Sequence, residues 1–94
     1  MNQLQLPFQR HSATSRAAAL AMRPKAGTKR ARVLEYIASH GSYGTTDDEG
    51  MHDLAMDGST YRPRRIELAQ ARLIENAGTR PTRSGQQAVV WVAV

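Results

Sequence analysis

The feature that most constrains the fold is a proline placed just after a run of helix-capping residues. Pro63 lacks a backbone N–H, so a helix tolerates it only within the first turn. Ser59 and Thr60 precede it, and each can cap a helix through its side-chain oxygen. We therefore expect a helix that begins near residues 59–61 and ends near residues 70–71.

Two further helices are predicted upstream of this one. Thr28 caps the first, which covers residues 29–40. Its apolar side chains fall on one face at helical spacing, and they are Val33, Leu34, Ile37 and Ala38. The second helix reaches Met56 and opens with a capping box over residues 46–49, which puts acids in its first turn. The turn at residues 57–58 leads directly into the third helix.

The C-terminal part of the sequence predicts a β-hairpin. Residues 73–76 and residues 88–94 have the pattern of strands, and the second segment is uncharged and rich in valine. Residues 77–87 between them are polar, basic and rich in turn formers. The expected fold is mainly α with a small hairpin (α+β). It is a winged helix-turn-helix, with a three-helix core and a two-stranded wing.

The chain divides into an arm and one small domain. Its 94 residues suit a single modest core, which we assign to residues 28–94. Residues 1–27 form a basic N-terminal arm with a short alanine-rich helix over residues 14–22. That helix is too short to be stable alone, so Leu20 and Met22 must dock on the domain or on a partner.

Charged residues are segregated along the chain. Residues 1–32 carry seven Lys or Arg and no acid, and residues 33–57 carry six acids and no Lys or Arg. Residues 58–94 carry six Arg and two Glu, which brings the net charge to +5. Segregated positive charge indicates a polyanionic partner, most commonly nucleic acid.

Several function classes lack their sequence signals. The chain has no cysteine for a thiolate metal site and no apolar run long enough for a membrane span. Its start lacks signal-peptide features, so we expect a cytoplasmic protein. No nucleophile–base pair, paired-carboxylate site or phosphate-cradling loop is evident, which predicts a non-enzyme without cofactors. Asp48 and His52 have ligand spacing but no third ligand, so no metal is expected.

A set of positions carries a family resemblance, and they are Pro63, Arg64, Glu67, Leu68, Leu73, Ile74, Gly78, Arg80, Thr82, Ser84, Gly85 and residues 88–91. Through them, residues 28–94 resemble the small winged helix-turn-helix domains common in bacteriophages and prophages. The resemblance implies double-stranded DNA binding with the third helix in the major groove. It implies a small transcriptional regulator or replication accessory factor. Such domains usually have glycine where this chain has Arg72, because the helix ends there in a left-handed conformation.

The predicted nucleic-acid contacts are basic or hydroxyl side chains on the third helix, the hairpin and the start of the first helix. They are Ser59, Thr60, Arg62, Arg64, Arg65, Arg80, Arg83, Lys29 and Arg30. Arg62 and Arg64 suit bidentate contact with guanine or with phosphate. Arg64 has a structural alternative in an i, i+3 ion pair with Glu67. Arg80 and Arg83 suit phosphate or minor-groove contact from the wing.

Arg65 and the acidic residues allow a second interpretation. On a helical wheel Arg65 faces inward, where it can pair with Asp47, Asp48 or Asp53 of the preceding helix. The acidic segment 47–57 is expected to cap its helix and to form a solvated face turned away from DNA. That face or the arm 1–27 would bind a protein if the domain is an interaction module in a replication, transcription or virion assembly. RNA binding is less favoured, since no aromatic-studded sheet is evident, and the oligomeric state stays open.

Overall fold

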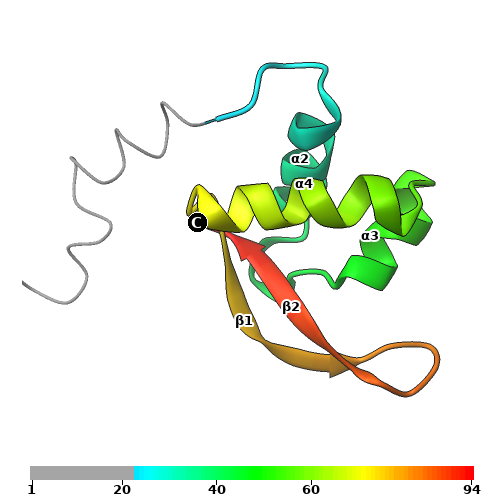
Figure 1. The fold of residues 1–94 in the computed structure, drawn as a ribbon. Coiled ribbons are helices and arrows are strands. Elements are labelled where there is room, and N and C mark those ends of the chain that lie inside the picture. The colour runs from blue at the N-terminus through cyan, green and yellow to red at the C-terminus, as the bar shows by residue number, and fades with distance from the viewer. Residues whose placement is uncertain (1–22) are drawn as a thin grey trace, which may run out of the picture.

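Within residues 23–94 the fold is α+β, with three helices and a two-stranded antiparallel hairpin, as the sequence predicts (Figure 1). A computed structural model describes residues 23–94, so the predicted helix at 14–22 lies outside the described residues. The elements are α2 (Lys29–Ser39), the 3-10 turn η2 (Gly41–Tyr43), α3 (Asp47–Leu54), α4 (Gly58–Gln70), β1 (Ile74–Pro81) and β2 (Gln87–Ala93).

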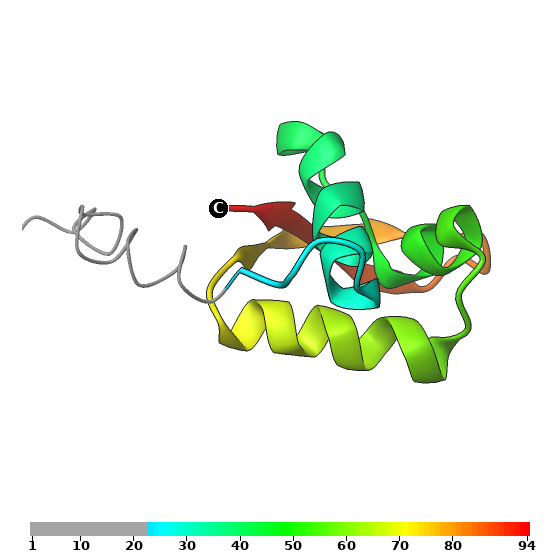
Figure 2. The same ribbon diagram turned by 90° about the horizontal axis from the view of Figure 1, so that it is seen from above.

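The core lies where α2 crosses α4, with the start of the hairpin beneath the crossing (Figure 1, Figure 2). Its buried side chains are Val33, Leu34, Ile37, Met56, Tyr61, Leu68, Leu73 and Ile74. Tyr61 is almost fully buried. Ala38 is exposed and Ala31 is buried instead, because the buried face of α2 centres on Val33 and Ile37. The face of α2 was therefore predicted correctly except at its edge.

β1 is longer than predicted, β2 has its predicted length but begins one residue earlier, and the turn is shorter. β1 pairs with β2 from Ile74 opposite Ala93 to Pro81 opposite Gln87, with one irregularity between residues 76 and 79. Residues 82–86 therefore form the turn. Trp91 also exchanges backbone hydrogen bonds with Thr45, at 2.8 and 3.0 Å. This bridge ties the segment before α3 to the outer side of β2.

The connection between α3 and α4 differs from the prediction at both helix ends. α3 ends at Leu54, because Ala55 is left-handed and the N–H of Met56 bonds back to Met51 at 3.0 Å. Met56 then enters the core instead of extending the helix. α4 begins at Gly58 with Asp57 as its cap, since that carboxylate accepts the N–H of Thr60 at 3.0 Å. Ser59 and Thr60 lie inside the first turn, so the prediction that they cap the helix was wrong.

The residue that follows the C-terminal cap of α4 is an arginine in the left-handed backbone conformation. The N–H of Leu73 bonds to the carbonyl of Leu68, and that of Arg72 to Ala69, both at 3.0 Å. This bond pattern requires a left-handed residue after the helix. Arg72 takes that conformation with a φ of 62°, as the resemblance implies.

Replacing Arg72 with glycine should raise the free energy of unfolding by about 1 kcal/mol, because glycine has no Cβ to strain at positive φ. Urea denaturation measures the change. Ala71→Gly is the matched control, because Ala71 has a φ of −79° and is right-handed. Glycine there should lower the stability by about 0.5–1 kcal/mol. Changes of the same sign in the two variants would contradict the left-handed assignment.

Candidate nucleic-acid interface

The solvent side of α4 carries a stripe of exposed residues at helical spacing, and they are Ser59, Arg62, Ile66 and Gln70. The Arg62 side chain is 54% exposed and Ile66 is 43% exposed. A guanidinium, an aliphatic side chain and two polar side chains on one face can contact base edges, thymine methyl groups or another protein surface. This stripe is the part of α4 that a large ligand could reach.

Arg65 lies next to this stripe, on the side of α4 that faces α3, and is held by α3. Its Nε and Nη2 atoms donate to the two carboxylate oxygens of Asp47 at 2.9 and 2.7 Å. Its guanidinium also lies 4.7 Å from the centre of the Trp91 ring. The predicted pairing with an acid of the preceding helix is confirmed. Arg62 makes only a distant contact with the same carboxylate, at 3.8 Å, so it stays available to a ligand.

Arg80 fastens the hairpin to η2 and α3. It donates to both carboxylate oxygens of Glu49, at 2.9 and 3.1 Å, and to the backbone carbonyls of Tyr43 and Gly44, at 3.0 and 3.1 Å. Its guanidinium also lies 3.9 Å from the centre of the Tyr43 ring. These hydrogen bonds hold the pKa of Glu49 below its usual value, helped by the backbone N–H of Thr46. Most of the hydrogen-bonding capacity of Arg80 is thus directed into the protein.

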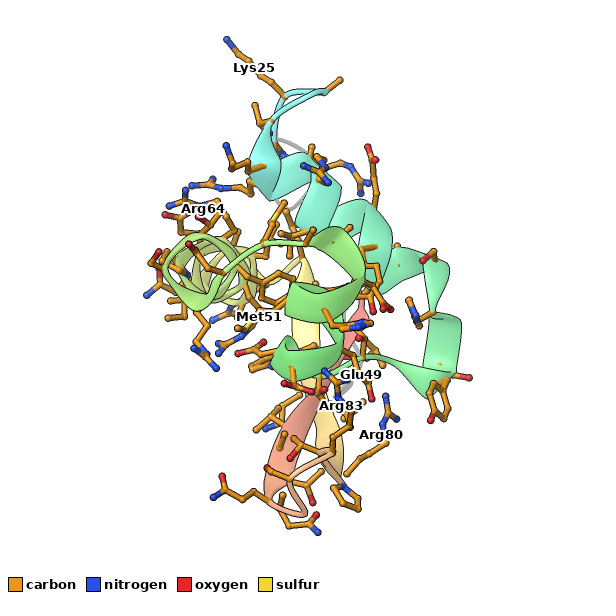
Figure 3. The ribbon with its side chains drawn as sticks, turned by 90° about the vertical axis from the view of Figure 1, so that its right-hand side faces the viewer. Lys25, Glu49, Met51, Arg64, Arg80 and Arg83 are labelled. Carbon is orange, nitrogen blue, oxygen red and sulfur yellow. The ribbon has the colours of Figure 1, made fainter. Side chains whose placement is uncertain are left out.

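Arg83 differs from Arg80 because it stays open to solvent. Its side chain is 74% exposed, and its Nε lies 3.8 Å from an Asp48 oxygen. Figure 3 shows Arg80 and Arg83 near Glu49, beneath α3. An exposed ion pair of this length contributes little, so Arg83 is the arginine of the hairpin that can meet an external anion.

The acids in the first turn of α3 are partners of arginines and not simply a solvated face. Asp47 accepts Arg65, Glu49 accepts Arg80, and Asp48 lies near Arg83. The sequence interpretation assigned these carboxylates mainly to helix capping. The structure corrects it, because the first turn of α3 sits between α4 and the hairpin, where both elements bring cations to it.

Glu67 of α4 is bracketed by two arginines. Arg64 donates to its two carboxylate oxygens at 2.8 and 2.9 Å. Arg30 of α2 donates twice to one of those oxygens, at 3.1 and 2.8 Å. Hydrogen bonds from Arg64 and then Arg30 hold the pKa of Glu67 below its usual value. The structural alternative predicted for Arg64 is confirmed, and Arg30 joins it.

A shallow groove opens between the start of α2 and α4, beside this cluster. It is lined by Pro24, Lys25, Thr28, Lys29, Arg30, Arg64 and Glu67. Four of these side chains are cations and one is an acid, so the lining carries a net charge of +3. We call this feature the α2–α4 groove. Figure 3 shows Arg64 on the α2 side of α4, whereas Arg80 and Arg83 lie toward the hairpin.

The structure therefore divides the predicted contact residues into two groups. One group lies at the α2–α4 groove and contains Lys29, Arg30 and Arg64; the other faces α3 and contains Arg62, Arg65, Arg80 and Arg83. Ser59 and Thr60 lie in the first turn of α4, where Ser59 donates to Asp57 at 2.8 Å. Sequence reasoning missed Lys25 and the double role of Glu67. No local spacing connects Glu67 with Arg30, which lies 37 residues away in the chain.

Comparisons of this chain with models of known protein families, with curated proteins and with solved structures found no match. Within residues 23–94, no group of three or more His, Cys, Asp or Glu side chains is arranged to hold a metal ion. No helix in the same range is long and apolar enough to cross a membrane. The evidence for function therefore comes from the fold and from the charged surfaces described above.

Proposed function

We propose that this protein binds double-stranded DNA as a winged helix-turn-helix domain, with α3 and α4 as the helix-turn-helix and the β1–β2 hairpin as the wing. In this arrangement α4 lies in the major groove. The observation that carries the proposal is the exposed stripe of α4, which contains Arg62 and has basic side chains on both flanks. On the sequence resemblance we further propose a role as a small regulator or accessory factor of bacteriophage type.

The charges at the two flanks of α4 support binding to a polyanion. Lys25 and Lys29 lie on the α2 side, and Arg83 projects from the hairpin turn on the other. A helix in the major groove has a phosphate strand along each side, since the groove is about 12 Å wide. Cations on both sides of α4 match that spacing of charge.

Binding to a duplex should weaken steeply as salt rises, because each phosphate contact releases counterions. We expect the logarithm of the binding constant to fall with the logarithm of the salt concentration by about 0.9 per phosphate contacted. Fluorescence anisotropy with a labelled duplex, between about 0.05 and 0.2 M salt, measures the slope. Absence of binding at the lowest salt would overturn the proposal.

Arg62→Gln tests which part of the domain reads sequence. After selection of a preferred duplex from a random pool, this variant should lose about 1–3 kcal/mol of discrimination at one base position. Arg32→Gln is the matched control, because Arg32 is exposed on α2 and lies outside both flanks of α4. It should keep the preference of the wild-type protein.

A protein-interaction module is the second candidate, and a specific observation favours it. Ile66 is 43% exposed in the middle of the α4 stripe, and several predicted DNA contacts are already neutralised by acids. The exposed apolar side chain would then contact a partner protein. Absence of duplex binding, together with capture of a purified partner that Ile66→Asp abolishes, would decide for this candidate.

A further inference from the structure

Four cationic side chains line the α2–α4 groove, and the ion pairs within the domain do not use all of their hydrogen-bond donors. Arg30 and Arg64 each direct two of their five N–H donors at Glu67, which leaves three on each guanidinium. Within residues 23–94 these remaining donors have no protein acceptor. Lys25 and Lys29 add two ammonium groups at the rim.

Glu67 keeps the two guanidinium groups in fixed positions although it is itself negative. Its carboxylate accepts four hydrogen bonds from them, with donor–acceptor distances between 2.8 and 3.1 Å. The arginine side chains are 37% and 33% exposed, so their unused edges face the groove and solvent. Fixing an arginine in advance reduces the entropy that a ligand contact must overcome.

We propose that the α2–α4 groove is a phosphate-binding site that takes a backbone phosphate of the duplex. The inference deepens the proposed function and depends on it. A phosphate oxygen accepts from the free edges of Arg30 and Arg64, while Lys29 closes the site from its rim. Planar guanidinium groups match the geometry of phosphate oxygens in a bidentate contact.

The position of the groove identifies which phosphate strand it meets. It borders α4 on the side of α2, whereas the hairpin lies toward α3 (Figure 2, Figure 3). With α4 in the major groove, the strand on the α2 side passes along the groove lining. The hairpin arginines meet the other strand only through Arg83, since Arg80 is engaged with Glu49 and Tyr43.

The test compares two variants that each remove one cation from an exposed position of α2. Lys29→Gln should flatten the slope of log K against log salt by about 0.9, which corresponds to about eightfold weaker binding at 0.1 M salt. Arg32→Gln removes an equal charge three residues later, outside the groove lining. It should change the slope by less than half as much.

The Glu67→Gln variant should bind the duplex more tightly than the wild-type protein, which a misfolded variant could not do. Its amide oxygen can still accept hydrogen bonds from Arg30 and Arg64, so the arginines stay in place, but the only acid of the groove lining is removed. Duplex affinity should therefore rise several-fold. If the wild-type protein binds the duplex, either of two results would overturn the groove assignment and leave DNA binding intact. One is an equal slope for Lys29→Gln and Arg32→Gln, and the other is weaker binding by Glu67→Gln. Absence of duplex binding by the wild-type protein would overturn both.

Discussion

Replacing Gly50 with alanine should destabilise the fold by about 3 kcal/mol, despite the higher helix propensity of alanine. Gly50 is buried inside α3, and a Cβ at this position would overlap the ring of Tyr61. That ring is 1% exposed and packed in the core, so it cannot move aside. Urea denaturation followed by circular dichroism measures the loss.

Gly58→Ala is the matched control for this substitution. Gly58 is also helical, but its added Cβ would crowd only the guanidinium end of Arg62, which is flexible and exposed, and would lie at ordinary contact distance from Met51 Cε, 3.6 Å away. We expect a change within about 0.5 kcal/mol of zero, or a small gain. A loss in Gly58→Ala as large as that in Gly50→Ala would contradict the steric explanation.

A double-mutant cycle with Tyr61→Leu isolates the contact. The leucine side chain removes most of the aromatic ring against Gly50, so alanine at position 50 should cost much less in that background. The coupling energy between residues in contact is typically about 0.5–3 kcal/mol. Additive effects of the two substitutions would show that the Gly50 requirement comes from elsewhere.

The helices could be predicted from the sequence because their signals are local. The capping box at Thr46 and the cap at Thr28 are both present in the structure. Their side chains bond within three residues, so the pattern alone determines them. Asp57 and Ser59 illustrate the limit of this reasoning, since both can cap a helix and only the path of the chain selects the first.

The extent of the hairpin could not be predicted, because β1 contains residues that favour turns. Gly78 and Pro81 indicate a loop, yet the strand continues through Gly78 and ends only at Pro81. β2 supplies backbone partners along this length, with one irregularity between residues 76 and 79 that accommodates the glycine. Pairing with a distant segment thus overrode the local preference.

The sequence also could not predict fully which arginines pair with acids and which remain open to a ligand. Helix geometry predicted the Arg64–Glu67 pair as an alternative to ligand contact. It also placed Arg65 against Asp47, Asp48 or Asp53, and the structure shows that Asp47 is the partner. The partner of Arg80 lies 31 residues away in the chain, on an element whose orientation depends on the whole core. Charge counting therefore overestimated the cations that remain for a ligand.

Arg80→Met should lower the free energy of unfolding by about 2–3 kcal/mol, which makes Arg80 the most important polar side chain of the hairpin. The substitution keeps an aliphatic stem but removes the bonds to Glu49, Tyr43 and Gly44. The Arg80 side chain is 20% exposed, so water replaces these bonds only in part. Arg83→Met is the matched control on the same hairpin and should cost less than about 0.5 kcal/mol.

The pH dependence of the stability difference between wild type and Arg80→Met tests whether Glu49 is the partner through which Arg80 stabilises the fold. Because the pKa of Glu49 is lowered in the folded state from its ordinary value of 4.5, its stabilising effect is fully present above that value. The effect is lost as the pH falls through the folded pKa, since protonation removes the charge that attracts Arg80. The stability gap between wild type and Arg80→Met should therefore narrow in acid below about pH 4.5, and Glu49→Gln should abolish most of that dependence. A gap that stays constant down to pH 3 would place the contribution of Arg80 in the Tyr43 ring and the two backbone carbonyls instead of in the ion pair.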